Sequence, residues 1–298
     1  MAKKVKSINL YKKDFFPSKS NPEKVRSNEY KFSTTEYDEN GNVVLELKFN
    51  ADHQLEDKFV NKYNDKGVLV EEKHYLSAKD LAEHKTYELD ESGKILQAFK
   101  HYNDGTRDKI QYTYDNNGNL TEKTTIDSYD EVEAKEVFEY EGTNLIKKES
   151  FEYDDLVSKD TFAYDPDGNV VEESSWTEED SNRRSNTYDK NGHIEKVLFY
   201  NKKDELVAKT TYRYNEEGKI IGVAEETPYG NSKTTISYDE KGNAIEQIEK
   251  NDQGVLNNSA KRKFNENNDV VETEVFIEMH GKGVNQQYEL RYEYAYFN

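Results

Sequence analysis

Six histidines are the side chains of this sequence best suited to proton transfer or metal binding near neutral pH. They are dispersed over the chain: His53, His74, His84, His101, His193 and His280. The sequence has no His-Glu-x-x-His motif, no His pair at ligand spacing, no Gly-x-Ser-x-Gly element and no phosphate-cradling glycine loop. It also lacks cysteine, which excludes a thiol nucleophile and a thiolate metal site. We therefore expect solvated histidines, and neither an enzyme active site, a catalytic residue nor a cofactor.

Acidic turns offer a second kind of chemistry, because clustered carboxylates and amides bind calcium. The segments Asp165-Pro-Asp-Gly168 and Asp115-Asn-Asn-Gly118 resemble the start of a calcium-binding loop, but their glycine comes one residue early. Ser174 also stands where the first segment would need a bidentate acid. We expect these turns to be conformational, with no metal bound.

The same turn recurs along the whole chain and defines a repeat. An aromatic or apolar anchor precedes Asp or Asn, two further residues and usually Gly, and successive anchors lie 24 to 26 residues apart. A period of this length is typical of a repeat architecture. The anchors are Tyr37, Tyr63, Leu89, Tyr114, Tyr140, Tyr164, Tyr188, Tyr214, Tyr238 and Phe264.

The chemistry of this turn favours a β-hairpin. Asp or Asn after the anchor accepts hydrogen bonds from the backbone two residues on, and Gly supplies the positive φ that closes a bulged hairpin. Asn268 replaces Gly in the last turn and tolerates that conformation best among the other residues. We expect structural turn glycines at Gly41, Gly67, Gly93, Gly118, Gly168, Gly192, Gly218 and Gly242.

A second, looser turn lies between successive anchors, as in 49–54, 102–105 and 200–204. Two reversals in about 25 residues leave two strands of about seven residues each. Apolar and charged residues alternate along them, as the stripe Val43, Leu45, Leu47 and Phe49 shows. The sequence predicts an all-β fold of about ten tandem hairpins, a long antiparallel meander of roughly 20 strands with almost no helix. Because twist accumulates over many strands, we expect the sheet to curl or spiral.

Composition restricts the possible partners. The net charge of -19 disfavours nucleic-acid phosphates and anionic membrane surfaces, and no apolar run is long enough to span a bilayer. The N-terminus has no apolar region typical of a signal peptide. We expect a cytoplasmic protein, with export by a non-classical or injection system as the alternative.

The N-terminal segment has the opposite charge. Residues 1–30 contain eight Lys or Arg against three Asp or Glu. Two interpretations stay open: a basic leader that lies on its own acidic sheet, or a docking arm for a partner. We expect this leader at 1–30 and one repeat domain at 31–298.

The turn and its lead-in resemble a known family. The segments Gln111-Tyr-Thr-Tyr-Asp-Asn-Asn-Gly-Asn-Leu120 and Tyr212-Arg-Tyr-Asn-Glu-Glu-Gly-Lys-Ile220 are similar to the YD repeats of the RHS family. The resemblance covers roughly residues 30–298. It implies β-meanders that wrap into shells around toxin cargo or form extracellular stalks.

A regular scaffold without a catalytic motif favours a non-enzymatic structural or protein-interaction module, whose partner is another protein. The family resemblance implies an alternative: a cargo, effector-associated or immunity-type protein of a bacterial toxin or injection system. A third possibility is a carbohydrate-binding surface that uses exposed tyrosines and Trp176, because aromatic faces also stack on sugars. We expect most tyrosines to stack on one another across strands instead.

Overall fold

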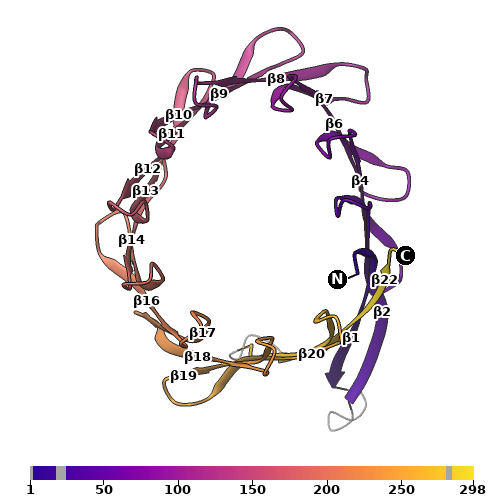
Figure 1. The fold of residues 1–298 in the computed structure, drawn as a ribbon, viewed down its shortest axis with the longest axis vertical. Coiled ribbons are helices and arrows are strands. Elements are labelled where there is room, and N and C mark those ends of the chain that lie inside the picture. The colour runs from indigo at the N-terminus through magenta and orange to yellow at the C-terminus, as the bar shows by residue number, and fades with distance from the viewer. Residues whose placement is uncertain (1–2, 18–24, 280–283) are drawn as a thin grey trace. The chain divides into compact units, whose positions relative to one another are not determined.

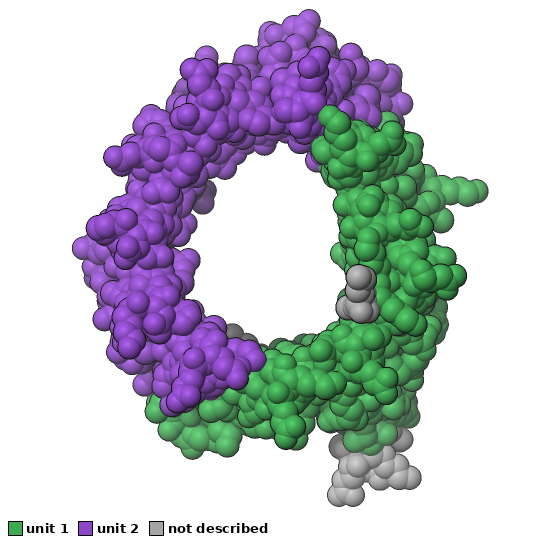
Figure 2. All heavy atoms as spheres, viewed as in Figure 1, with its two compact units in different colours: residues 1–84, 232–298 green, residues 85–231 purple. Residues whose placement is uncertain are grey.

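The computed structural model describes residues 3–17, 25–279 and 284–298. This part of the chain forms 22 antiparallel β-strands and no helix (Figure 1), so the predicted all-β hairpin meander is confirmed. Two compact units are distinguished in Figure 2: unit 1 comprises 1–84 and 232–298, and unit 2 comprises 85–231. His280 lies outside the described residues.

Unit 1 contains β1 (Val5–Pro17), β2 (Val25–Tyr37), β3 (Val43–Phe49), β4 (Leu55–Tyr63), β5 (Leu69–Tyr75), β19 (Ala244–Asn251), β20 (Leu256–Phe264), β21 (Val270–Ile277) and β22 (Gln286–Tyr296). Unit 2 contains β7 (Ile95–His101), β8 (Arg107–Tyr114), β9 (Leu120–Ile126), β10 (Val132–Glu141), β11 (Asn144–Glu152), β12 (Asp155–Tyr164), β13 (Val170–Thr177), β14 (Ser181–Tyr188), β15 (Ile194–Tyr200), β16 (Leu206–Tyr214) and β17 (Ile220–Thr227). Two strands, β6 (Leu81–Leu89) and β18 (Gly230–Tyr238), run across the unit boundaries.

The sheet of unit 1 joins the two ends of the sequence. Its strand order is β5-β4-β3-β2-β1-β22-β21-β20-β19-β18, so β1 lies between β2 and β22. The basic N-terminal segment thus provides a strand and part of the next one. The prediction of a curled or spiralling sheet is wrong at the chain ends, because the first and last strands pair with each other instead of ending as separate edges.

Unit 2 is a meander in which each strand from β7 to β17 pairs with the next. Within each unit, strands contact only their sheet neighbours, so each sheet is a single layer. A single layer buries little: among the described residues the buried hydrophobic side chains are Tyr30, Ala98, Phe99 and Val197. Ladder hydrogen bonds, cross-strand pairs and the turns must therefore supply much of the stability.

The anchored turn, here called the YD turn, has one geometry at nine of its ten positions; the turn after Tyr140 is shorter, with Glu141 paired to Asn144. At its clearest example, Asp115 N–H donates to Asn119 O at 2.9 Å and Gly118 N–H donates to Asp115 O at 3.0 Å. This is a type I turn closed by a residue in the left-handed region, with Gly118 at φ 85°. All eight predicted turn glycines have φ between 77° and 93°, and Asn268 adopts 66° in the last turn.

A side-chain network reinforces this backbone turn. The Asp115 Oδ1 atom accepts hydrogen bonds from the backbone N–H of Asn117 (2.9 Å) and Asn119 (2.8 Å), while the Asn119 amide donates to Oδ2 at 2.9 Å. The hydrogen bond from the Asn119 backbone contributes most to holding the pKa of Asp115 below its ordinary value. The pattern explains why Asn so often follows the turn glycine, since it completes the contact with Asp. The same lowered pKa occurs at Asp38, Asp165, Asp189 and Asp239.

Anchor tyrosines tie consecutive repeats together through their hydroxyl groups. The Tyr188 hydroxyl donates to Val170 O at 2.7 Å, the first strand residue after the preceding YD turn. The arrangement recurs at the anchors Tyr63, Tyr114, Tyr164 and Tyr214, and the non-anchor Tyr294 of β22 makes a similar hydrogen bond to Val270 O, with distances of 2.7 to 3.0 Å. Burial raises the pKa of Tyr294 to about 12. In a single-layer sheet without a deep core, each of these tyrosines contributes both the partial burial of its ring and a hydrogen bond from its hydroxyl.

Candidate binding site

The second turns lie at the opposite end of the hairpins from the YD turns, and several have the same backbone geometry. Asp204 N–H donates to Asn201 O at 2.9 Å and Asn201 N–H donates to Glu205 O at 3.0 Å, as in a YD turn. In some of these turns a residue other than glycine holds the left-handed position, with φ 58° at Asp204 and 65° at Asp130. Other second turns carry glycine at this position, as Gly105 shows with φ 87°.

Exposed aromatic side chains gather at this second-turn end of unit 2. One lies in or beside five of its six second turns, and we call these five residues the aromatic row: Tyr102, Tyr129, Tyr153, Trp176 and Tyr229, exposed by 39%, 84%, 68%, 40% and 99%. The remaining second turn, between β15 and β16, is followed by the exposed Leu206 and Val207. Because each hairpin contributes two strands, neighbouring row positions are about 10 Å apart.

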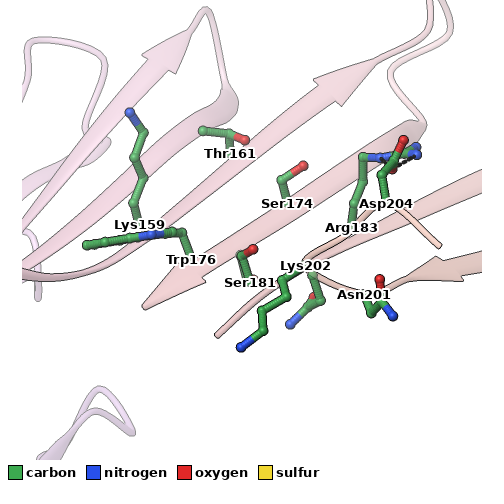
Figure 3. Close-up of a pocket in the computed structure, with 11 residues that line it drawn as sticks. Lys159, Thr161, Ser174, Trp176, Ser181, Arg183, Asn201, Lys202 and Asp204 are labelled. Atoms are coloured by element: carbon green, nitrogen blue, oxygen red, sulfur yellow. Dashed lines mark hydrogen bonds and ion pairs between the residues drawn. The ribbon is translucent and has the colours of Figure 1, made fainter. Parts of the chain in front are cut away.

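A shallow groove of about 350 Å³ lies beside Trp176 (Figure 3). Strand register places its polar wall: Trp176 on β13 pairs with Lys159 on β12 and with Ser181 on β14. Ser174, two residues before Trp176 and on the same face, pairs with Arg183. Figure 3 shows the Trp176 ring beside Lys159, with Arg183 and Asp204 at the other end of the groove. Hydroxyl and amide groups of β12 to β14 and the 201–205 turn thus surround one exposed indole.

The Arg183 guanidinium, a positive charge in the lining of the groove, contacts two acidic side chains and an aromatic ring. The Arg183 guanidinium contacts Asp204 at 2.5 Å and Glu172 at 3.2 Å, and it lies 3.9 Å over the Tyr200 ring. The hydrogen bond to Asp204 contributes most to raising the pKa of Arg183. The Trp176 side chain is 40% exposed and carries a hydrogen-bond donor, its indole N–H.

The groove offers several kinds of binding group. Its lining combines an aromatic face, hydroxyls, amides and paired charges. Within 3–17, 25–279 and 284–298, no group of three or more His, Asp or Glu is arranged to hold a metal ion. The same ranges contain no helix that could cross a membrane.

The structure separates the histidines from one another and from this groove. His74 Nε2 lies 2.7 Å from Asp57 and its ring stacks on Phe59 at 4.2 Å, while His193 contacts Asp189 in a YD turn. His74 and His193 are thus half-buried and hydrogen-bonded, not freely solvated as expected, whereas His53 is exposed. The predicted turn glycines lie at the YD-turn end, away from the aromatic row. Trp176 was a candidate from the sequence, but the other residues of the aromatic row were not. The pattern that could have indicated them is an aromatic residue in or beside successive second turns.

Known proteins resemble this chain in structure at low similarity. No family model matches the chain, and no curated protein matches it. Among solved structures, the pore of the Photorhabdus luminescens Tc holotoxin is similar with a TM-score of 0.40 and 13% identity over 93% of this chain and 17% of that chain. A TcdB2-TccC3 crystal structure gives 0.29 and 11% over 81% and 17%, and a porin-like protein from Bacteroides uniformis gives 0.28 and 11% over 98% of each chain. This chain therefore spans about a sixth of the length of the toxin chains that it matches.

Proposed function

We propose that this chain is a non-enzymatic protein-interaction module of the YD-repeat type, which presents the aromatic row of unit 2 to a partner protein. The exposure of the row carries the proposal. Anchor tyrosines at the YD-turn end are half-buried with bonded hydroxyls, whereas Tyr129 and Tyr229 are exposed by 84% and 99%. Gathered exposed aromatics on a highly charged surface are typical of interaction sites.

The groove provides the kind of anchor point that protein interfaces use. Trp, Tyr and Arg dominate interface binding energy, and here Trp176 lines the same groove as Arg183, which stacks on Tyr200. Because Arg183 is already paired with Asp204, a partner meets a pre-organised surface and loses less side-chain entropy on binding. An extended peptide segment running along the second turns fits this arrangement.

The test is selection of binders from a random peptide display library against the whole chain. We expect selected peptides to lose affinity at least about tenfold when Trp176→Ala is introduced. Because Trp176 is only partly exposed, Tyr129→Ala provides a second variant that barely perturbs packing. Phe32→Ala, an exposed aromatic outside the row, is the matched control and should change affinity less than about twofold. Equal affinity for all four chains would contradict the proposal.

A glycan array run with the same variants decides the third possibility. Glycan binding that depends on Trp176, together with no peptide selected through the row, would replace a protein partner by a carbohydrate. The toxin-associated role is a narrower proposal supported by the resemblance of the turns to YD repeats. It requires in addition that the partner be a protein encoded beside this chain.

A further inference from the structure

The pairing of β22 with β1, here called the seam, reproduces the register of a YD hairpin. Tyr296 pairs with Val5 and Ala295 pairs with Ser7, so one residue of β1 is skipped. In the first YD hairpin Tyr37 pairs with Val43 and Glu36 with Leu45, with the same skip. Tyr296 therefore occupies the anchor position of an additional hairpin.

The hydrogen bond that closes a YD turn is present at the seam as well. Phe297 N–H donates to Lys4 O at 2.9 Å, where Asp38 N–H donates to Asn42 O at 2.9 Å in the first YD turn. In both places a backbone hydrogen bond joins the residue after the anchor, Phe297 or Asp38, to the residue before the paired strand. The seam is a repeat hairpin whose two strands come from opposite ends of the sequence.

Charge and aromatic contacts match the two strands of the seam. Lys13 on β1 lies 3.7 Å from Glu289 on β22, and Lys12 lies 4.7 Å over the Tyr288 ring. Arg291 on β22 lies 4.3 Å over Tyr11 of β1. The basic N-terminal charge therefore faces complementary groups of β22, and these partly exposed contacts are screened by salt.

The seam differs from the other strand pairings of each unit in its connection. Those pairings join strands that are consecutive in sequence, so an opened pair stays tethered by the chain between its two strands. No turn connects β1 to β22, so once the pair opens, re-forming it requires closing a loop of nearly the whole chain. An opened seam presents two edges with matched register and charge.

We propose that the seam is a docking surface for a second copy of this chain, with β1 of one copy paired to β22 of the other in the register of the closed chain. Such an exchange makes the same contacts as the closed chain, so no new interface has to form. Protein concentration then decides between the closed and the exchanged state.

Cysteine cross-linking tests this directly, because the natural chain contains no cysteine. Chains with Lys13→Cys are mixed with chains with Glu289→Cys, opened in moderate urea at high protein concentration, dialysed and oxidised. The matched control mixes Lys261→Cys and Glu246→Cys, an ion pair at 3.3 Å between β20 and β19, which one turn connects. We expect at least about tenfold more disulfide-linked dimer from the seam mixture. Equal dimer yields from the two mixtures would overturn the proposal.

A locked chain provides the second measurement. With Lys13→Cys and Glu289→Cys in one molecule, oxidation before the urea step should keep the seam closed and leave only monomer in light scattering. Reduction should restore the dimer. Dimer formation by the oxidised, locked chain would show that exchange does not use the seam. Peptide binding at Trp176 does not depend on either outcome, so failure here leaves the proposed function standing.

Discussion

The two ends of the hairpins in unit 2 are built from the same turn but present different chemistry. At the YD-turn end, glycine, Asp and Asn satisfy one another and the anchor tyrosine is half-buried, as at Tyr188 and Val170. At the second-turn end, the same backbone geometry occurs with Asp130 or Asp204 in the strained position, and aromatic side chains face solvent. One end therefore contributes contacts within the repeats, while the other exposes aromatic surface to solvent.

The largest effect is expected where a YD turn requires positive φ. Gly168 has φ 85°, and no neighbouring atom lies within 4 Å of the place that a Cβ would take, so Gly168→Val acts through backbone strain alone. We expect it to lower the free energy of unfolding by about 1–3 kcal/mol in urea titration. The same change at Glu178, exposed beside a second turn, should stay within about 0.5 kcal/mol. Equal losses would mean that the two ends do not differ in this way.

The anchor hydroxyl is the next contribution. Tyr214→Phe removes the donor to Ile194 O, which lies at 2.7 Å, and keeps the ring. The expected loss is about 1 kcal/mol in the free energy of unfolding. Tyr229→Phe removes a fully exposed hydroxyl and should change nothing measurable. A neutral Tyr214→Phe would contradict the hydroxyl tie between repeats.

Acid should weaken the YD turns. Their Asp carboxyls have pKa values below the unfolded ones, so the stabilisation is present above the unfolded pKa and is lost as pH falls through the folded pKa. Replacing Asp115 and Asp165 by Asn keeps an acceptor that cannot titrate, as Asn215 shows in its own turn. The thermal midpoint of this variant should fall less than that of the natural chain between about pH 5 and about pH 2. Parallel curves would exclude a role for these two carboxylates.

The local half of this structure was predictable and the non-local half was not. Turn positions follow from chemistry within five residues, as Asp115 and Gly118 show, and alternation then gives the strands. The pairing of β1 with β22 could not be predicted, because many Lys and Glu patterns in this chain are equivalent and only the folded sheet selects one register. The groove at Trp176 depends on that same kind of cross-strand register, between β12, β13 and β14, which sequence spacing alone does not supply.

The smallest effect concerns calcium, for which we expect no change. If the acidic turns are conformational, EDTA and 1 mM calcium should leave the thermal midpoint where it is, because nothing bound to the folded state is removed or added. Sodium chloride should instead raise stability modestly by screening the net charge of -19. A shift of several degrees with calcium, absent at matched ionic strength with sodium, would contradict this.

Two tyrosines on either side of β9 test most directly whether the two ends of the hairpins serve different purposes. Tyr114 is an anchor whose hydroxyl donates to Ile95 O at 2.9 Å, and Tyr129 is 84% exposed in the aromatic row. The measurement compares Tyr114→Ala and Tyr129→Ala in their thermal midpoints and in their affinity for a selected peptide, the latter at a temperature where both variants are folded. We expect Tyr129→Ala to weaken binding at an unchanged midpoint, and Tyr114→Ala to lower the midpoint at unchanged affinity. Loss of both properties in both variants, or of neither in Tyr129→Ala, would contradict this division between the two ends.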